Sequence, residues 1–297
     1  MLASLDKNTE DSSLAPKDIA PTDFSEGEEI VIRARSGWIA LDWRELYQAR
    51  ELLYFLTWRD INIRYKQTVL GVAWAVLQPL LTMMIFTVIF GKFAGIPSEG
   101  VPYPVFVFAG LVPWTFFANG VAQAGQSLIS QQQMLTKVYF PRLFIPTAAA
   151  GAFLIDMLIS LGIYAVLLLV YRVVPGPGIV LLPILIGLTV MATLGLGYAL
   201  AALTVAYRDF RYVIPFLIQV LMYLSPVIYP VSMIPKRFQA IAALNPMFGI
   251  IEAYRSAILG VPWNFASLTI STASTLVLFV FGLFYFRRTE RRFADIA

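Results

Sequence analysis

Few side chains of this chain could take part in covalent or acid–base chemistry. Its 297 residues include no cysteine and no histidine. Thiol nucleophiles, disulfides, Cys/His zinc sites and histidine acid–base schemes are therefore excluded. No segment matches the Gly-x-x-x-x-Gly-Lys-Ser/Thr loop that cradles nucleotide phosphates. We therefore expect no catalytic residue, no metal and no cofactor on this chain, and a role other than that of an enzyme.

Three charged side chains in apolar surroundings remain as candidates. Asp156 is the one charge within a long apolar stretch, while Glu252 and Arg255 lie three residues apart. Residues at this spacing face each other on a helix, so these two could form a structural pair. A proton- or sodium-coupled carrier usually has more ionisable groups within the membrane. We expect Asp156 to have a structural role, and a function of its charge stays open.

The scarcity of charge also decides which elements must position these residues. The chain is 59% hydrophobic and 13% charged, whereas soluble domains are about 25% charged. The bilayer must therefore be the solvent of most of the chain. Six apolar stretches are long enough, or nearly so, to cross it as helices. They are residues Val69–Phe90, Val105–Ser130, Phe144–Tyr171, Ile179–Ala206, Tyr212–Tyr229 and Asn264–Phe286. The expected fold class is an all-α polytopic membrane protein with six transmembrane helices.

The distribution of Lys and Arg predicts the orientation. Thirteen of these residues fall near span ends on one side and five on the other. Because basic residues favour the cytoplasmic side, both termini are expected in the cytoplasm of an inner-membrane protein. The basic balance of the chain then reflects topology and not nucleic-acid binding. Residues 1–36 carry 8 acidic and 4 basic side chains, which is typical of a disordered cytoplasmic tail; a partner-binding role for the tail is the alternative.

Residues 37–67 are expected to contain an amphipathic helix that precedes the first span. At 100° per residue, Tyr54, Trp58 and Ile61 fall on one stripe with Tyr47 and Tyr65. A second apolar ridge of Leu52, Leu56 and Ile63 lies on the opposite side. An ordinary interfacial helix among the headgroups needs one apolar face. Two apolar sides favour a helix between the membrane domain, residues 68–297, and another protein.

Two connections between spans also differ from plain turns. Residues Gln131–Arg142 form a cytoplasmic loop that either joins two spans or projects into a partner. Between the fifth and sixth spans, prolines that include Pro235 and Pro246 separate two short apolar segments, Lys236–Leu244 and Met247–Leu259. Because proline ends helices, we expect two short helices that dip back into the outer face of the membrane. Two helices lying flat on that surface are the alternative.

Aromatic residues near the outer ends of three spans could line a translocation path. The orientation above brings six such rings to one level. A lipid-facing aromatic belt is the alternative for any one of them. The six are Phe86, Phe90, Phe106, Phe108, Tyr223 and Tyr229.

Several motifs together resemble one family. They are the stretch Arg64–Pro79 at the entry to the first span, Phe108–Trp114, Tyr207–Arg211, Ser225–Pro230, and Asn245–Met247 followed by Glu252 and Arg255. In order and over about residues 40–290, this set resembles the permease subunits of polysaccharide ABC exporters. The resemblance is greatest to O-antigen exporter permeases, with teichoic-acid and capsule exporter permeases as relatives.

The resemblance implies a half-transporter. Two copies of this chain would pair with two separate ATP-binding subunits, which would carry ATP and magnesium, and would export a lipid-linked glycan. A stand-alone channel or carrier without an ATPase is the alternative from another class. The resemblance also implies residue roles. The interface with the ATPase would include Tyr54, Trp58, Arg59, Asp60, Ile61, Lys137 and Tyr139, and an external gate would include Pro235, Asn245, Pro246, Glu252 and Arg255.

Overall fold

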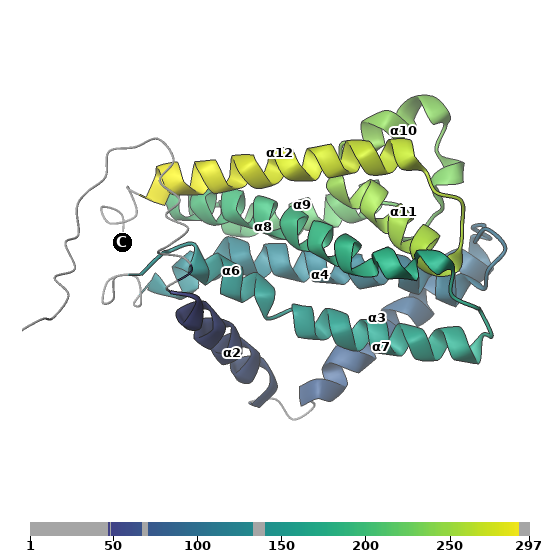
Figure 1. Ribbon diagram of the computed structural model, residues 1–297, viewed down its shortest axis with the longest axis horizontal. Helices are drawn as coiled ribbons and strands as arrows, with labels where there is room; N and C mark the ends of the chain where they lie inside the picture. Colours follow the sequence, from purple (N-terminus) through teal and green to yellow (C-terminus); the bar gives the residue numbers. More distant parts are fainter. Residues whose placement is uncertain (1–46, 48, 67–70, 133–139, 291–297) are drawn as a thin grey trace, which may run out of the picture. The chain divides into compact units, whose positions relative to one another are not determined.

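The described part of the chain is entirely helical. The computed structural model describes residues 47, 49–66, 71–132 and 140–290, and the predicted tail at 1–36 lies outside them. Within the described ranges no strand occurs, which confirms the predicted all-α class there. The α-helices (Figure 1) are α2 (Arg50–Lys66), α3 (Gly71–Phe86), α4 (Tyr103–Ser130), α6 (Phe144–Gly151), α7 (Leu154–Val170), α8 (Leu182–Ala206), α9 (Phe210–Leu224), α10 (Lys236–Ala242), α11 (Pro246–Leu259) and α12 (Phe265–Glu290).

Five helical segments among the described residues are long and apolar enough to cross a membrane. They correspond to the predicted spans one to four and six. The first continues from α3 into a π-helix, η1 (Thr87–Phe93), and the fourth begins with a 3-10 turn, η2 (Pro177–Leu181). The fifth predicted span overlaps α9, which has 15 residues and is shorter than the others. Helices are the expected result, because a helix satisfies its own backbone hydrogen bonds where no water is available.

The third predicted span is not one continuous helix. It divides into α6 and α7 at Ala152 and Phe153, although residues 144–170 together are long and apolar enough to cross a membrane. This break produces a new helix N-terminus, and Asp156 lies in the first turn of α7. A carboxylate is favoured at that position because the N-terminal end of a helix carries partial positive charge.

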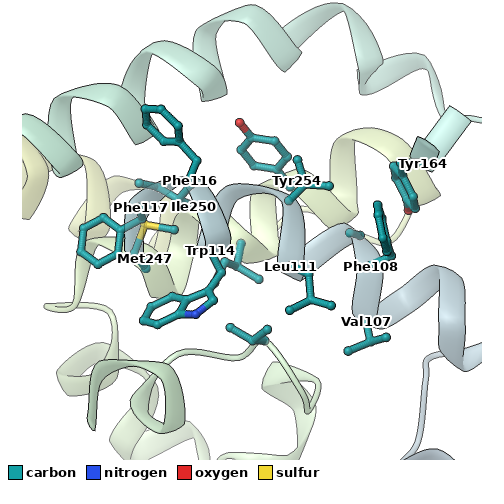
Figure 2. Close-up of a cluster of buried hydrophobic side chains, with 14 of the residues drawn as sticks. Val107, Phe108, Leu111, Trp114, Phe116, Phe117, Tyr164, Met247, Ile250 and Tyr254 are labelled. Carbon is teal, nitrogen blue, oxygen red and sulfur yellow. The ribbon is translucent and has the colours of Figure 1, made fainter. Parts of the chain in front are cut away.

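The helix at the centre of the fold is α4. Of its most apolar stretch, 78% is buried, against 6–28% for the other four long segments. It packs against α3, α6, α7, α8, α9 and α11. Figure 2 shows part of this core, in which Phe108 of α4 stacks on Tyr164 of α7 with ring centroids 5.7 Å apart. A central helix that is apolar on all sides is expected where every side meets another helix.

The two helices α8 and α12 cross with almost no space between their backbones. A Cβ atom added at Gly282 of α12 would lie 2.0 Å from the carbonyl oxygen of Gly195 on α8. A Cβ atom on Gly195 would in turn lie 2.8 Å from the Cα atom of Phe279. Small residues at a crossing let helix backbones approach closely, which is how helices associate in the absence of a hydrophobic driving force. These two glycines therefore set the distance between α8 and α12.

Substitution of Gly282 tests this crossing. We expect Gly282→Ala to lower the thermal stability of the purified protein, because overpacking a close contact costs about 1–3 kcal/mol. Gly187→Ala on α8 is the matched control, since no atom lies within 4 Å of a Cβ at Gly187. The measurement is the unfolding midpoint in detergent. Equal midpoints for the two variants would contradict the role of Gly282.

Candidate functional site: helix α2, the α6–α7 break and the α11 end

The predicted amphipathic helix is present as α2, and it has one buried and one exposed apolar side. Leu56 is fully buried, and Leu52 and Leu53 pack with it against a cluster that includes Phe144 and Ile145 at the start of α6. The buried side follows from the position of Leu56, which lies four residues after Leu52 and three after Leu53, so that the three leucines share one side of the helix. This packing attaches α2 to the membrane domain along α6.

The exposed side of α2 carries large aromatic residues. Tyr54 is 71% exposed and Trp58 is 51% exposed, and Phe55 lies beside them. The structure brings Arg59 and Asp60 together as a pair, with 2.8 Å between guanidinium and carboxylate, while Ile61 is half-buried. Exposed apolar groups that gather on one side of a helix mark a surface for a partner or for lipid. The role of these residues at an ATPase interface stays a prediction.

One element of the two-ridge prediction is wrong. Ile63 was expected to share a ridge with Leu52 and Leu56, but it is 56% exposed. The reason is geometric. Ile63 lies seven residues after Leu56, close to the end of α2, and there the contacts with the membrane domain come from Arg64 and Tyr65 instead.

The C-terminal end of α2 is attached to the break between α6 and α7 through Asp156. The Nη1 of Arg64 lies 2.8 Å from Oδ2 of Asp156. The hydroxyl of Tyr65 donates a hydrogen bond to Oδ1 of the same carboxylate. The Arg64 guanidinium also stacks over the ring of Phe153, 3.5 Å from its centroid, a cation–π contact. Both carboxylate oxygens of Asp156 are therefore bonded to α2. These bonds agree with the expected structural role, and a function of the charge stays open.

Burial and the bond to Asp156 raise the pKa of the Tyr65 hydroxyl above its ordinary value. Tyr65 therefore remains a hydrogen-bond donor to Asp156 at physiological pH. The sequence signal that could have identified this cluster is weak. Arg64 and Asp156 are 92 residues apart, and the break at Ala152 and Phe153 contains neither proline nor glycine. We name Arg64, Tyr65, Phe153 and Asp156 the α2–α7 junction.

The predicted coupling loop is only partly described. The helix α4 ends at Ser130, and Gln131 follows as its C-cap. Lys137 and Tyr139 lie outside the described residues, so their predicted place at the ATPase interface stays a prediction. At the far end of the loop, Nη1 of Arg142 donates to the backbone carbonyl of Glu290, at 2.9 Å. The end of the loop is thus bound to the end of α12.

The six aromatic residues predicted to line a path are not equivalent. Phe106 and Phe108 are fully buried in the core of the chain. The prediction is wrong for these two, because α4 is covered on every side by other helices. Phe86 and Phe90 are half-buried and form an edge-to-face pair, 5.6 Å between centroids. Tyr223 is 60% exposed, and the hydroxyl of Tyr229 donates to its carbonyl at 2.9 Å. A path role for these four stays a prediction.

The two predicted short helices between the last spans are present as α10 and α11. Pro235 precedes α10, and Pro246 is the first residue of α11. Asn245 caps α11 by accepting a hydrogen bond from the backbone of Met247 at 3.1 Å, and its amide donates to Ser225 at 2.8 Å. The helix α11 is buried against α4, α8 and α12. Whether α10 and α11 dip into the membrane or lie flat on its outer surface stays a prediction.

The side chain of Arg255 joins α11 to the rest of this end of the molecule. It is 3% exposed. Its guanidinium donates to the carbonyls of Phe106, Val227 and Tyr229 at 3.3, 2.7 and 3.3 Å. It also lies over the Phe106 ring, 3.7 Å from the centroid. Burial lowers the pKa of Arg255 to about 10, so the side chain keeps its charge at neutral pH. Backbone carbonyls and a ring face, not a carboxylate in contact, stabilise this buried cation.

Glu252 does not pair with Arg255, contrary to the expectation from their spacing. Its Oε1 accepts a hydrogen bond from the Asn264 amide at 3.3 Å. Among the described residues its shielded Oε2 has no hydrogen-bond partner. Burial raises the pKa of this carboxyl above its usual range, and the hydrogen bonds from Asn264 and Ser267 oppose that shift. The two side chains leave α11 in different directions because Arg255 is drawn to α4 and to the segment after α9.

Charge exchange tests the α2–α7 junction. Arg64→Asp and Asp156→Arg each place like charges in contact, so each single variant should unfold at a lower temperature than the parent. The double variant should recover at least half of the loss, because residues in contact have coupling energies of about 0.5–3 kcal/mol. The control is Arg59→Asp, whose partner Asp60 is on the same helix. Additive losses in the double variant would show that the two side chains do not interact.

The several long apolar helices indicate that the chain is a multi-pass membrane protein. Residues 51–259 match the family model described as ABC-2 type transporter. The chain belongs to the ABC-2 type transporter family.

Named relatives agree with this assignment. The chain is 33% identical to the O-antigen export system permease protein RfbA of Myxococcus xanthus over 216 residues, which cover 72% of this chain and 82% of that protein. It is 30% identical to RfbA of Klebsiella pneumoniae over 247 residues, 83% of this chain and 95% of that one. It is 26% identical to the polysialic acid transport protein KpsM of Escherichia coli over 243 residues, 78% and 91% of the two chains.

Proposed function

We propose that this chain is the transmembrane subunit of an ATP-driven exporter that moves a lipid-linked polysaccharide, namely O-antigen, out of the cytoplasm across the inner membrane. The observation that supports this most is the similarity, over most of the chain, to relatives named as O-antigen export permeases. The chain itself acts in transport and is not an enzyme. ATP and magnesium are bound by a separate ATP-binding subunit.

The proposed topology has six crossings, with both termini in the cytoplasm. At about 1.5 Å per residue, α9 is about 22 Å long, less than the roughly 30 Å of a bilayer core. The buried segment Ser225–Val231 follows it and completes the crossing. Irregular backbone at membrane depth is tolerated where protein covers it. In this topology α10 and α11 lie towards the external face and re-enter the membrane there as a gate.

The proposed partners are a second copy of the chain and two ATP-binding subunits. The exposed aromatic side of α2, formed by Tyr54, Phe55 and Trp58, would contact an ATP-binding subunit. The α2–α7 junction would then carry a movement of α2 to the transmembrane helix α7, since an ion pair, a hydrogen bond and a cation–π contact join the two. The loop with Lys137 and Tyr139 would form a second contact with that subunit.

A capsule polysaccharide is the second candidate substrate. The similarity to KpsM, named as a polysialic acid transport protein, favours it, at a lower identity than the O-antigen relatives. Deletion of the chain's gene in its host separates the substrates. If the proposal is correct, O-antigen disappears from the surface while lipid-linked glycan accumulates inside the cell. Loss of capsule with normal O-antigen would replace the first candidate by the second, and no change in either would contradict both.

Substitutions on α2 test the proposed coupling. We expect the Tyr54→Asp/Trp58→Asp variant to insert and dimerise normally but to lose most glycan-dependent ATP hydrolysis and export. The reason is that two carboxylates would replace the apolar surface offered to the ATP-binding subunit. ATP hydrolysis by the purified complex and surface glycan would both be measured.

Ile63→Asp is the matched control for this variant. It makes the same kind of change at an exposed position of the same helix, but about 140° around the helix from Trp58. The control should retain coupling. Normal coupling in the double variant, or equal loss in both variants, would argue against the proposed interface.

A further inference from the structure

A cavity of about 530 Å³ lies beside Arg255, at the end of the helices where α10 and the loop before α4 meet. Figure 1 shows both of these segments at the end of the helices opposite α2. The volume falls in the range of about 300–1,000 Å³ that is usual for small-molecule sites. Its polar lining comes from several separate segments and consists of Glu99, Ser232, Gln239, Glu252, Arg255 and Asn264.

Two carboxyl groups on the cavity wall, those of Glu99 and Glu252, supply hydrogen-bond acceptors. Oε1 of Glu252 accepts one long hydrogen bond, 3.3 Å from the Asn264 amide, while its Oε2 is shielded and has no partner among the described residues. Glu99 lies on the wall with φ at 53°, a left-handed conformation that is uncommon for a residue with a side chain. Its contact with the Ser232 hydroxyl is long, at 3.4 Å.

The same cavity also presents donors. A guanidinium has five N–H groups, and three of those of Arg255 donate to backbone carbonyls. Two N–H groups of this cavity-lining side chain remain for other acceptors. The guanidinium lies close to the backbone of α4, because a Cβ atom at Gly110 would lie 3.0 Å from its Nη2. Donor and acceptor groups therefore line the same cavity.

The mixture of charges decides which ligand chemistry fits. A metal cation would meet the buried positive charge of Arg255, and a phosphate would meet the carboxylates Glu99 and Glu252. A hydroxyl group both donates and accepts, so neighbouring hydroxyls can donate to a carboxylate and accept from a guanidinium. The remaining wall includes Val101, Val231 and Leu259, which suits the C–H face of a sugar ring.

We propose that this cavity binds a sugar unit of the exported glycan through its hydroxyl groups, with Glu252 as acceptor and Arg255 as donor, after the unit has reached the external side. The proposal rests on the proposed function and topology. It makes the α11 end a binding site for the emerging polymer, so the gate residues contact the substrate as well as closing the path.

Cysteine labelling tests the site, because the chain has no natural cysteine. Ser232→Cys and Val261→Cys place a thiol on the cavity wall, and Ala94→Cys places one on the exposed loop outside it. Whole cells that export the glycan are compared with cells in which glycan synthesis is blocked. A membrane-impermeant maleimide is added to both, and the labelling rate is measured. Labelling rates with and without glycan synthesis are compared for whichever wall variant still exports glycan.

We expect glycan export to slow labelling of the wall thiol at least twofold while labelling of Ala94→Cys stays unchanged. Maleimide attached to the wall thiol should also reduce export. Equal labelling with and without glycan would overturn the proposal, as would equal slowing at the wall and at Ala94→Cys. Wall thiols that never label, in cells where Ala94→Cys does, would show that a second copy covers the cavity and would overturn it too.

Failure of the proposed function has a different signature. If Ala94→Cys is not labelled from outside, the topology is wrong. If deletion of the chain leaves surface glycan intact, the substrate is wrong. Either result is independent of the rate at the cavity wall, so a failed binding site and a failed function can be distinguished.

Discussion

Close packing around α4 is the constraint on which the rest of the structure depends. Six other α-helices contact this one helix, and its own residues are almost all apolar or small. In a bilayer, apolar helices gain little by leaving lipid for protein, so contact distance and fit hold them together. Large side chains such as Phe108 and Phe117 fill the core. Glycines such as Gly120, where a Cβ atom would lie 2.6 Å from Thr193, allow neighbouring helices to approach.

The two ends of the molecule solve the problem of buried charge in different ways. At the α2–α7 junction an acid and a base meet directly, and the acid also lies at a helix N-terminus. At the α11 end a lone guanidinium is surrounded by three carbonyl oxygens and a ring. An ion pair can separate and re-form between two moving helices. A cation bound by fixed carbonyls from α4 and from the segment after α9 instead holds these segments at one distance. Under the proposed function, the first arrangement would suit a contact that transmits movement, and the second would suit a rigid frame for a gate.

These differences also explain how the two apolar sides of α2 can have separate roles. The leucine side packs against α6, whereas the aromatic side is exposed. A helix that is attached along one side and at its C-terminal end can transmit a displacement that a partner causes on its other side. Such a displacement would first reach a transmembrane helix at the α2–α7 junction.

The sequence by itself determined the fold class, five of the spans by length and composition, the presence of α2, α10 and α11, and the family. Each of these depends on local composition, periodicity or proline position, which a chain carries wherever it folds. Only the tertiary structure decided that Phe106 and Phe108 are buried and that Asp156 pairs with Arg64. It also decided that Arg255 donates hydrogen bonds to backbone carbonyls and does not pair with Glu252. The spacing of Glu252 and Arg255 allowed a pair, but carbonyls from two distant segments compete for the same guanidinium. The partner of Asp156 is 92 residues away. It comes within reach because leucine packing brings the end of α2 to the break between α6 and α7, where Gly151 is the last residue of α6.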